Sequence, residues 1–521
     1  MAKQIQAGGG TLTPVLRSGA RSAHYGARLD RVAWAGALVG TAITAVALRV
    51  WIYRSPLGVP DSDEAIVGLM TRHILHGGVT TFFWGQSYGG SQEALLTAPV
   101  FGLFGSSWLA LRIVPILLSI PTALVIRQVG RRTVHEPAAT TAAALSFVWP
   151  AFLLYKTTHQ WGFYASAVLY SALLLWLALR LVERPGSGRA ALLGLTIGLA
   201  LWDDIQLIPV VTGVTVWICV RCRRELQRLW IVPVLAVVGA APALAWNLQH
   251  DFASLHSAVA DTTSYQHRLR VFASPLLPML IGLRTPFSQQ PLLSSVVADG
   301  LLLVLVAAFA YGAWRSRRTS TSLLYAVLLI FPFVYALAPQ TLYTAEPKYL
   351  LTLAPALTLL VAQLATTRAR GAVLLALGAA LSLASLRGME HWVETTPPNP
   401  PIAPADITPL VDLLHRDGID RVYAMYWAAY RIDFDTKERI IATDSKLTHI
   451  RFVDGIARPA HNPFIRWEPY EREVDRASRP AYVFFDWAAD RKRGKRRAVR
   501  HQLELHGYRR STYADLIVYV P

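Results

Sequence analysis

Three carboxylates stand close together near the start of the chain, at Asp61, Asp63 and Glu64, shortly after a long apolar stretch. A carboxylate at the edge of a membrane can act as a general base on an acceptor hydroxyl, which makes Asp63, with Glu64 beside it, the candidate catalytic pair. The same spacing also predicts a helix start, with Asp61 as the N-cap and Glu64 three residues on. The two interpretations are compatible, because Asp61 and Glu64 can cap a helix while Asp63 does the chemistry. We also count Asp61 among the residues expected to bind substrate.

The residues after these acids have the spacing of an amphipathic helix. Ile66, Val67, Met70 and Ile74 fall on one face, and Gly77-Gly78 ends the pattern. We expect this helix to lie on the outer membrane surface with its apolar face in the lipid.

A dense group of aromatic, amide and small residues follows at 82–93, and it includes Gln86, Tyr88 and Glu93. Aromatic faces suit the C–H faces of a sugar ring, while amides and carboxylates suit its hydroxyl groups. The alternative is an aromatic belt at the membrane surface. That alternative does not account for Glu93, which an apolar run follows directly, so we expect this segment to bind substrate.

Several basic residues lie where apolar runs begin or end. Lys156 and His159 follow one such run, Arg268 lies in a long loop, and Lys348-Tyr349 opens a late run. A basic residue at a membrane boundary can pair with a lipid phosphate, or it can extend its charge to the interface. Several of them on a face that otherwise avoids Arg and Lys favour a phosphate-binding site.

An acidic pair, Asp203 and Asp204, interrupts an apolar region. Acids near membrane depth are functional candidates, and a short outer turn is the alternative. Tandem acids also suit a divalent cation, but one pair without a third ligand is a weak site. We treat the pair as substrate-binding candidates and expect neither a metal ion nor an organic cofactor.

The composition is typical of a membrane protein. Hydrophobic residues make up 53% of the 521 residues, charged residues make up 16%, and the mean hydropathy is +0.35. A soluble chain carries about 25% charged residues. These values exclude a cytosolic multidomain enzyme and a disordered protein. The two cysteines exclude a fold built on disulfides.

Eleven segments are apolar enough to suggest membrane spans. They are 32–53, 109–126, 138–155, 161–181, 190–201, 205–220, 229–248, 300–314, 323–338, 349–365 and 372–386. The sequence therefore predicts a polytopic α-helical membrane protein, with the weakest spans on either side of the acidic pair.

The distribution of arginine predicts the orientation. Arginines recur in the tail 1–31 and in every second loop, and the net charge is +18. Loops rich in Arg and Lys stay in the cytoplasm, so the N-terminus is expected inside and, after eleven crossings, the C-terminus outside. This explains the basic balance without nucleic acid. The predicted location is the cytoplasmic (inner) membrane.

We expect a transmembrane domain at 32–388, with outer loops at 54–108 and 249–299, and a small extracytoplasmic α/β domain at 389–521. The segments expected in the last domain are a helix over 407–414, stopped by Gly418, and strands at 422–426, 481–485 and 516–520. Its basic run at 491–497 suits either a solvated face or a site for anionic headgroups.

Several features in this order resemble the membrane-embedded GT-C glycosyltransferases, in particular the family 39/83-like branch related to protein O-mannosyltransferases and aminoarabinose transferases. The matching residues are Asp63-Glu64-Ala65, 102–105 before 111–115, the span at 194–202, and Glu346-Pro347-Lys348-Tyr349-Leu350. The resemblance covers 54–365. The stretches 85–91 and 426–431 are similar to uncharacterised bacterial members.

The resemblance implies GT-C architecture and a reaction. Such enzymes take a sugar from a polyprenyl-phosphate carrier on the outer face and transfer it to a glycan, lipid or protein acceptor. By this resemblance Asp63 deprotonates the acceptor, and attack at the anomeric carbon displaces the lipid phosphate with inversion. Lys348, Lys156 or Arg268 would stabilise the leaving phosphate.

One feature departs from the family. Many relatives carry a lysine near the position of Asp203-Asp204, so phosphate contact here must come from elsewhere or through a cation. Two other functions stay open: a lipid or polysaccharide transporter or flippase without covalent chemistry, and an envelope scaffold with a dead site. Symmetry between chain halves would favour a transporter. The sequence shows none, and the acidic first loop favours the enzyme.

Overall fold

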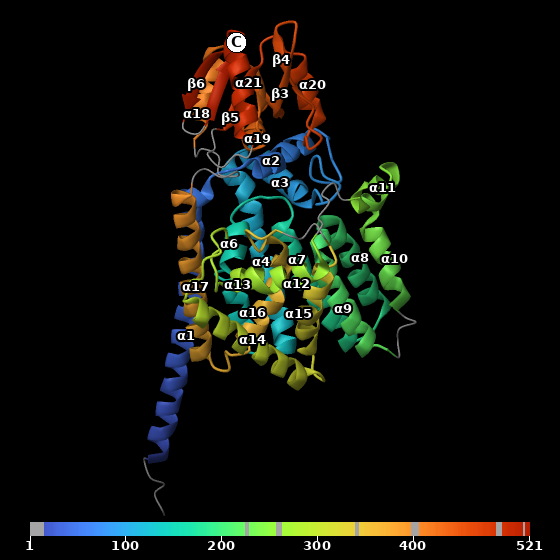
Figure 1. Ribbon diagram of the computed structural model, residues 1–521. Helices are drawn as coiled ribbons and strands as arrows, with labels where there is room; N and C mark the ends of the chain where they lie inside the picture. Colours follow the sequence, from blue (N-terminus) through green and yellow to red (C-terminus); the bar gives the residue numbers. More distant parts are fainter. Residues whose placement is uncertain are drawn as a thin grey trace, which may run out of the picture.

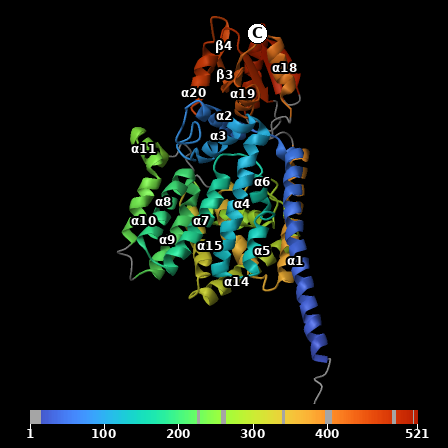
Figure 2. The same ribbon diagram turned by 180° about the vertical axis from the view of Figure 1, so that it is seen from behind.

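The computed structural model describes residues 15–223, 229–256, 263–338, 343–396, 406–485, 492–513 and 516–521. A bundle of mostly upright helices forms the larger body, and an α/β domain formed by residues 406–521 sits on one end of it (Figure 1). The view from behind shows the helices α2 and α3 between the two bodies (Figure 2). We call the α/β body the C-terminal domain.

Within the described residues, five helices are long and apolar enough to cross a membrane. They are α1 (Val15–Arg54), apolar from Asp30 onward, α4 (Trp108–Thr133), α7 (Tyr164–Glu183), α14 (Ser295–Ser316) and α17 (Arg368–Thr395). A sixth span is formed if α10 (Ile231–Gly239) and α11 (Ala241–Gln249), bent by 63°, count as one. The chain is thus a membrane protein with several apolar helices.

The other predicted spans are shorter or broken helices. They are α5 (Ala138–Leu145) with α6 (Ala151–Lys156), α8 (Ser187–Asp203), α9 (Ile208–Arg221), α15 (Ser322–Tyr335), and η7 (Lys348–Leu353) with α16 (Ala354–Ala362). Pro150, which precedes α6, lacks an amide hydrogen and cannot continue the earlier helix. All eleven predicted segments fall on helices, while the number that crosses the membrane stays a prediction.

The first predicted outer loop folds into η1 (Pro56–Gly58), α2 (Ser62–Leu75) and α3 (Gln92–Phe104). The expectation that α2 lays its apolar face in lipid is wrong. Ile66, Val67 and Met70 are buried in a core shared with the C-terminal domain. Gly68 permits this contact, because a Cβ there would lie 2.3 Å from the ring of Phe434.

The second predicted outer loop contains α12 (Tyr265–Val271), a helical turn at Phe272–Leu276, and α13 (Leu277–Ile281). Figure 1 shows α12 and α13 running across the upright helices. The loop ends earlier than predicted, because α14 begins at Ser295.

The C-terminal domain contains a five-stranded sheet in the order β2-β1-β5-β7-β6. Its strands are β1 (Arg421–Ala424), β2 (Ile441–Asp444), β5 (Ala481–Phe485), β6 (Arg509–Tyr513) and β7 (Leu516–Val520). The first three strands in this order are parallel, and β7 and β6 pair antiparallel. Strands β5 and β7 are buried along their whole length, as expected for strands covered on both faces.

Helices α18 (Thr408–Arg416), α19 (Tyr426–Asp435), α20 (Glu468–Asp475) and α21 (Arg493–Leu505) and the hairpin β3 (Lys446–Val453)–β4 (Ile456–Ala460) complete the domain. The three predicted strands and the helix before Gly418 are present, and Gly418 has a φ of +66°. The helix α17 continues to Thr395, beyond the predicted domain boundary at 388.

Candidate functional site

Asp63 lies in the first turn of α2, facing the C-terminal domain. The hydroxyl of Tyr426, the first residue of α19, donates a hydrogen bond to Asp63 Oδ1. The Ser62 hydroxyl donates to the carbonyl oxygen of Tyr426 at 2.5 Å. These two contacts join the start of α2 to the start of α19, so the candidate base sits where the two bodies of the molecule meet.

Asp61 caps α2 as predicted. Its Oδ1 accepts from the amide of Glu64 at 3.0 Å, and its Oδ2 accepts from the indole of Trp161 at 2.8 Å. Burial and the negative charges of Asp63 and Glu64 raise the pKa of Asp61 to about 8. Because both of its oxygens are occupied, Asp61 holds the start of the helix in place, and substrate contact by this residue stays a prediction.

Glu64 is the anchor of α2. It is 0% exposed and forms a two-pronged ion pair with Arg112 of α4, and its Oε1 also accepts from the amide of Gln160 at 2.8 Å. Burial alone raises the pKa of Glu64, but Arg112 and these hydrogen bonds outweigh burial and hold the pKa below its usual value. Of the predicted catalytic pair, only Asp63 keeps an exposed surface, so the geometry favours a positioning role for Glu64.

Two of the predicted phosphate-binding lysines come together around one carboxylate. Lys156 Nζ lies 3.6 Å from Glu346 Oε2, and Lys348 Nζ lies 3.4 Å from Glu346 Oε1. Lys156 also lies over the ring of Trp161, at 3.7 Å from its centroid. Two ammonium groups against one carboxylate leave a net positive charge in a largely buried position, which is suited to an anion.

Tyr88 lies near enough to a lysine and to the candidate base for both charges to act on it. Burial raises the pKa of its phenol, the positive charges of Arg466 and Lys348 lower it, and the negative charges of Asp63 and Asp204 raise it. The charge of Asp63 also acts on Lys156. The chain therefore brings its candidate base, its two lysines and a tyrosine from the predicted sugar-binding segment into one electrostatic neighbourhood.

The C-terminal domain adds a third cation, Arg466. Its Nε donates to the hydroxyl of Tyr426 at 3.3 Å. In the amide orientation that satisfies both groups, the oxygen of Gln86 accepts from Arg466 Nη1 at 2.8 Å and from Nη2 at 3.1 Å. The predicted sugar-binding residue Gln86 is thus fixed to the C-terminal domain beside the base.

Glu93 and Asp203 form a separate buried contact. The Ser166 hydroxyl lies 2.9 Å from Glu93 Oε1 and 2.7 Å from Asp203 Oδ2, and the Ser166 amide donates to Glu93 at 2.8 Å. One hydroxyl hydrogen cannot be donated fully to two carboxylates, so this contact favours a proton on one of the two carboxyl groups. Burial raises the pKa of Glu93 to about 7. This contact joins α3, α7 and α8, so it gives both acids a structural role.

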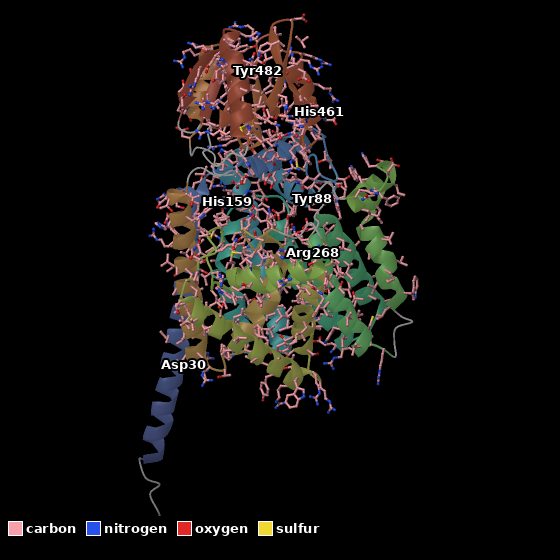
Figure 3. The ribbon with its side chains drawn as sticks, in the orientation of Figure 1. Asp30, Tyr88, His159, Arg268, His461 and Tyr482 are labelled. Atoms are coloured by element: carbon pink, nitrogen blue, oxygen red, sulfur yellow. The ribbon has the colours of Figure 1, made fainter. Side chains whose placement is uncertain are left out.

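The other candidates are distributed around the site. Asp204 Oδ1 accepts from the amide of Gln206 at 2.9 Å. The His159 ring stacks on Trp161 at 4.4 Å, and Figure 3 shows His159 and Tyr88 at the level where the bundle meets the C-terminal domain. The Lys348 ammonium lies 5.3 Å from the ring of Tyr349.

Arg268 lies deeper in the bundle than Tyr88 (Figure 3). Its guanidinium donates to the carbonyl oxygens of Ala336 at 2.7 Å and Thr263 at 2.5 Å. These contacts hold α12 against the end of α15, so they do not add Arg268 to the group around Asp63. Among the described residues, no group of three or more His, Cys, Asp and Glu side chains is placed to hold a metal ion.

No protein-family model and no curated sequence matches the chain. Solved structures do match. ArnT from Cupriavidus metallidurans bound to undecaprenyl phosphate superposes with a TM-score of 0.62, covering 92% of this chain and 98% of that chain at 12% identity. The chain has the GT-C fold. The apo state of the same ArnT gives a TM-score of 0.61 at the same identity and coverage.

A more distant match is the Archaeoglobus fulgidus oligosaccharyltransferase with Zn and sulfate, which has a TM-score of 0.46 and 14% identity, covering 93% of this chain and 72% of that chain. The likeness to ArnT confirms the resemblance at the level of the fold.

Four residues of the site were not singled out as candidates from the sequence: Arg112, Glu346, Tyr426 and Arg466. The first three stand in stretches that resemble GT-C relatives, at 111–115, 346–350 and 426–431, and that resemblance was the available signal for them. Arg466 had no local signal, because its partners Gln86 and Tyr426 lie in other elements.

Proposed function

We propose that this protein is a glycosyltransferase that moves a sugar from a polyprenyl-phosphate-sugar donor to an acceptor on the outer face of the cytoplasmic membrane. The observation that supports it most is the shared neighbourhood of Asp63, Lys156 and Lys348 in a chain with the GT-C fold. The match to an ArnT structure bound to undecaprenyl phosphate supports a polyprenyl phosphate as the carrier.

In the proposed reaction, Asp63 takes the proton from the acceptor hydroxyl or amine. The freed electron pair forms a bond to the anomeric carbon, and the bond from that carbon to the phosphate oxygen breaks with inversion. The oxygen leaves with the bonding electrons as the lipid phosphate. Tyr426 donates to Asp63 Oδ1, and none of the described residues donates to Oδ2, which leaves that oxygen to accept the proton.

The cations are suited to the leaving group. A sugar phosphodiester carries one negative charge and the released lipid monoester approaches two, so negative charge develops on the phosphate as the bond breaks. Lys156 and Lys348 share Glu346 and keep a net positive charge. Because Glu346 fixes both ammonium groups in advance, they stabilise that charge without reorganising.

The proposed topology follows the sequence. The N-terminus is inside, the helical domain at 32–388 crosses the membrane eleven times, and the C-terminal domain is outside. This orientation puts Asp63 on the face that has no nucleotide supply, where a lipid-linked donor is the available sugar source.

The test is release of the lipid phosphate. The purified full chain in nanodiscs is incubated with a panel of polyprenyl-phosphate pentoses and hexoses and a cell-envelope extract as acceptor source. Mass spectrometry measures free polyprenyl phosphate. We expect release from at least one donor by the wild type and none by Asp63→Asn. Equal release by the variant contradicts the proposal. Transbilayer movement of the donor that survives in Asp63→Asn, without release, favours the transporter.

A further inference from the structure

A second group of cations surrounds a cavity at the far end of the bundle. The cavity has a volume of about 700 Å³ and lies among the ends of α4, α7 and α9 and the loop from α14 to α15. Four arginines line it, Arg132, Arg221, Arg315 and Arg318, against a single lining carboxylate among the described residues, Glu183. None of these residues belongs to the site around Asp63.

Two of the arginines hold the elements around the cavity together. Arg221 donates to the carbonyl oxygen of Arg318 at 3.1 Å and to the hydroxyl of Ser322 at 3.0 Å, which holds the α14–α15 loop against α9. Arg132 Nε lies 3.1 Å from the Glu183 carboxylate, which joins α4 to α7. The cavity is therefore formed before any ligand arrives.

The other two arginines are available for a ligand. Within the part of the chain that the structure describes, the guanidinium groups of Arg315 and Arg318 have neither a hydrogen bond nor an ion pair, and Ser320 lines the cavity beside them. Guanidinium groups bind phosphate oxygens in a paired geometry, and a serine hydroxyl adds a donor. Orientation of the protein explains why arginines stand at this end, but it does not explain why four line one cavity.

The position of the cavity indicates that its ligand is a lipid. Helix α14 exposes apolar side chains along its length, such as Leu303 at 71% and Val304 at 65%, and ends with Tyr311 at 63% and Trp314 at 60%. Exposed tyrosine and tryptophan mark the level of the lipid headgroups. Because Arg315 follows Trp314 directly, the cavity opens at that level.

We propose that this cavity binds the phosphate of an anionic membrane phospholipid in the leaflet opposite the C-terminal domain. Basic pockets between membrane helices on the cytoplasmic side bind such headgroups. Four arginines against one carboxylate match a lipid with two phosphates best, so cardiolipin is expected to bind more tightly than phosphatidylglycerol.

The test uses the full chain in detergent. Native mass spectrometry measures binding of cardiolipin, phosphatidylglycerol and phosphatidylcholine to the wild type, to Arg315→Ala/Arg318→Ala and to a control, Arg131→Ala/Arg317→Ala. The control removes the same charge from neighbouring positions that do not line the cavity. We expect the cavity variant to bind cardiolipin about tenfold more weakly or worse, the control to resemble the wild type, and phosphatidylcholine to bind weakly throughout.

Three outcomes would overturn the proposal. They are equal losses in both double variants, equal binding of phosphatidylcholine, and competition by inorganic phosphate at the concentration of the lipid, which would indicate a site for soluble anions. If the alanine variant does not fold, Arg315→Gln/Arg318→Gln keeps the side-chain length and serves the same comparison. Asp63→Asn is expected to bind the lipid normally, so this test is independent of the proposed reaction.

Discussion

The two ends of the helical bundle use charge in different ways. Near the C-terminal domain charged groups are held in connected sets: Glu64 with Arg112, and Glu346 between Lys156 and Lys348. At the far end the arginines are numerous, and Arg315 and Arg318 are exposed. Fixed, buried charges hold reacting groups in one geometry, whereas open arginines attract and retain an anion. The number of charges alone is therefore a poor guide to chemistry.

The largest effect on this difference between the two ends is expected when the candidate base is removed. Asp63→Asn keeps the size of the side chain and loses its ability to take a proton, so transfer is expected to fall by about 10³-fold or more. Release of polyprenyl phosphate measures the loss, and gel filtration checks folding. The matched control is Asp61→Asn, which is expected to keep most of the activity. A greater loss of activity in the control would indicate that Asp61, and not Asp63, is the base.

The buried ion pair is expected to govern stability. Arg112→Met leaves Glu64 buried without its partner, which costs about 3–5 kcal/mol and should lower the thermal unfolding temperature in nanodiscs. Adding Glu64→Gln removes the stranded charge and is expected to recover part of the loss. No recovery in the double variant would show that Arg112 acts through packing and not through its charge.

The contact from the C-terminal domain is expected to position the base. Tyr426→Phe removes a donor to the Asp63 carboxylate, and a hydrogen bond to a charged group contributes about 1.5–3 kcal/mol. The transfer rate, measured as release of polyprenyl phosphate, should therefore fall by about tenfold or more. Tyr423→Phe, which loses a hydrogen bond to Asp475 elsewhere in the domain, is the control. Equal rates for all three proteins would contradict a role for Tyr426.

The lysines are expected to act on the donor. Lys348→Ala should raise the donor KM by about tenfold, the value of one charge-assisted contact, with a smaller effect on the acceptor KM. Initial rates at varied donor and acceptor concentrations separate the two. A donor KM equal to that of the wild type would exclude Lys348 from phosphate binding.

The smallest expected effect concerns Asp61. Burial raises the pKa of Asp61 from 3.8 to about 8, so its protonated form favours the folded state fully below about pH 4, and this contribution is lost progressively as the pH rises from there through about 8. Asp61→Asn keeps the oxygen that caps α2 and cannot ionise. Its unfolding temperature should therefore decline less than that of the wild type between about pH 4 and about pH 8. An equal decline in both proteins would show that a group other than Asp61 causes the pH dependence.

Local patterns predicted much of the fold. Eleven apolar segments, the cap at Asp61, the helix before Gly418 and three strands of the C-terminal domain all depend on residues close in sequence. The predicted surface position of α2 was wrong because its apolar stripe packs against α19, which lies far along the chain. A periodic stripe shows that a face is covered, and it does not show whether lipid or protein covers it.

The candidate site was predicted in part for the same reason. Asp63, Lys156, Lys348 and Tyr88 stood out because charge and aromatic groups are conspicuous at a membrane boundary. The bridging role of Glu346 and the approach of Tyr426 and Arg466 depend on tertiary packing, which no spacing reveals. Glu64 looked equivalent to Asp63 in sequence, and only its pairing with Arg112 distinguishes the two.

The hydrogen bonds from Tyr426 and Ser62 across to the opposite body have a consequence for biogenesis. Helix α2 emerges early in synthesis, yet the partners that fix its first turn belong to the last part of the chain to be made. The first turn of α2 therefore takes its final place only after the C-terminal domain has folded against it, and a chain truncated after α17 would lack the partners of Ser62 and Asp63.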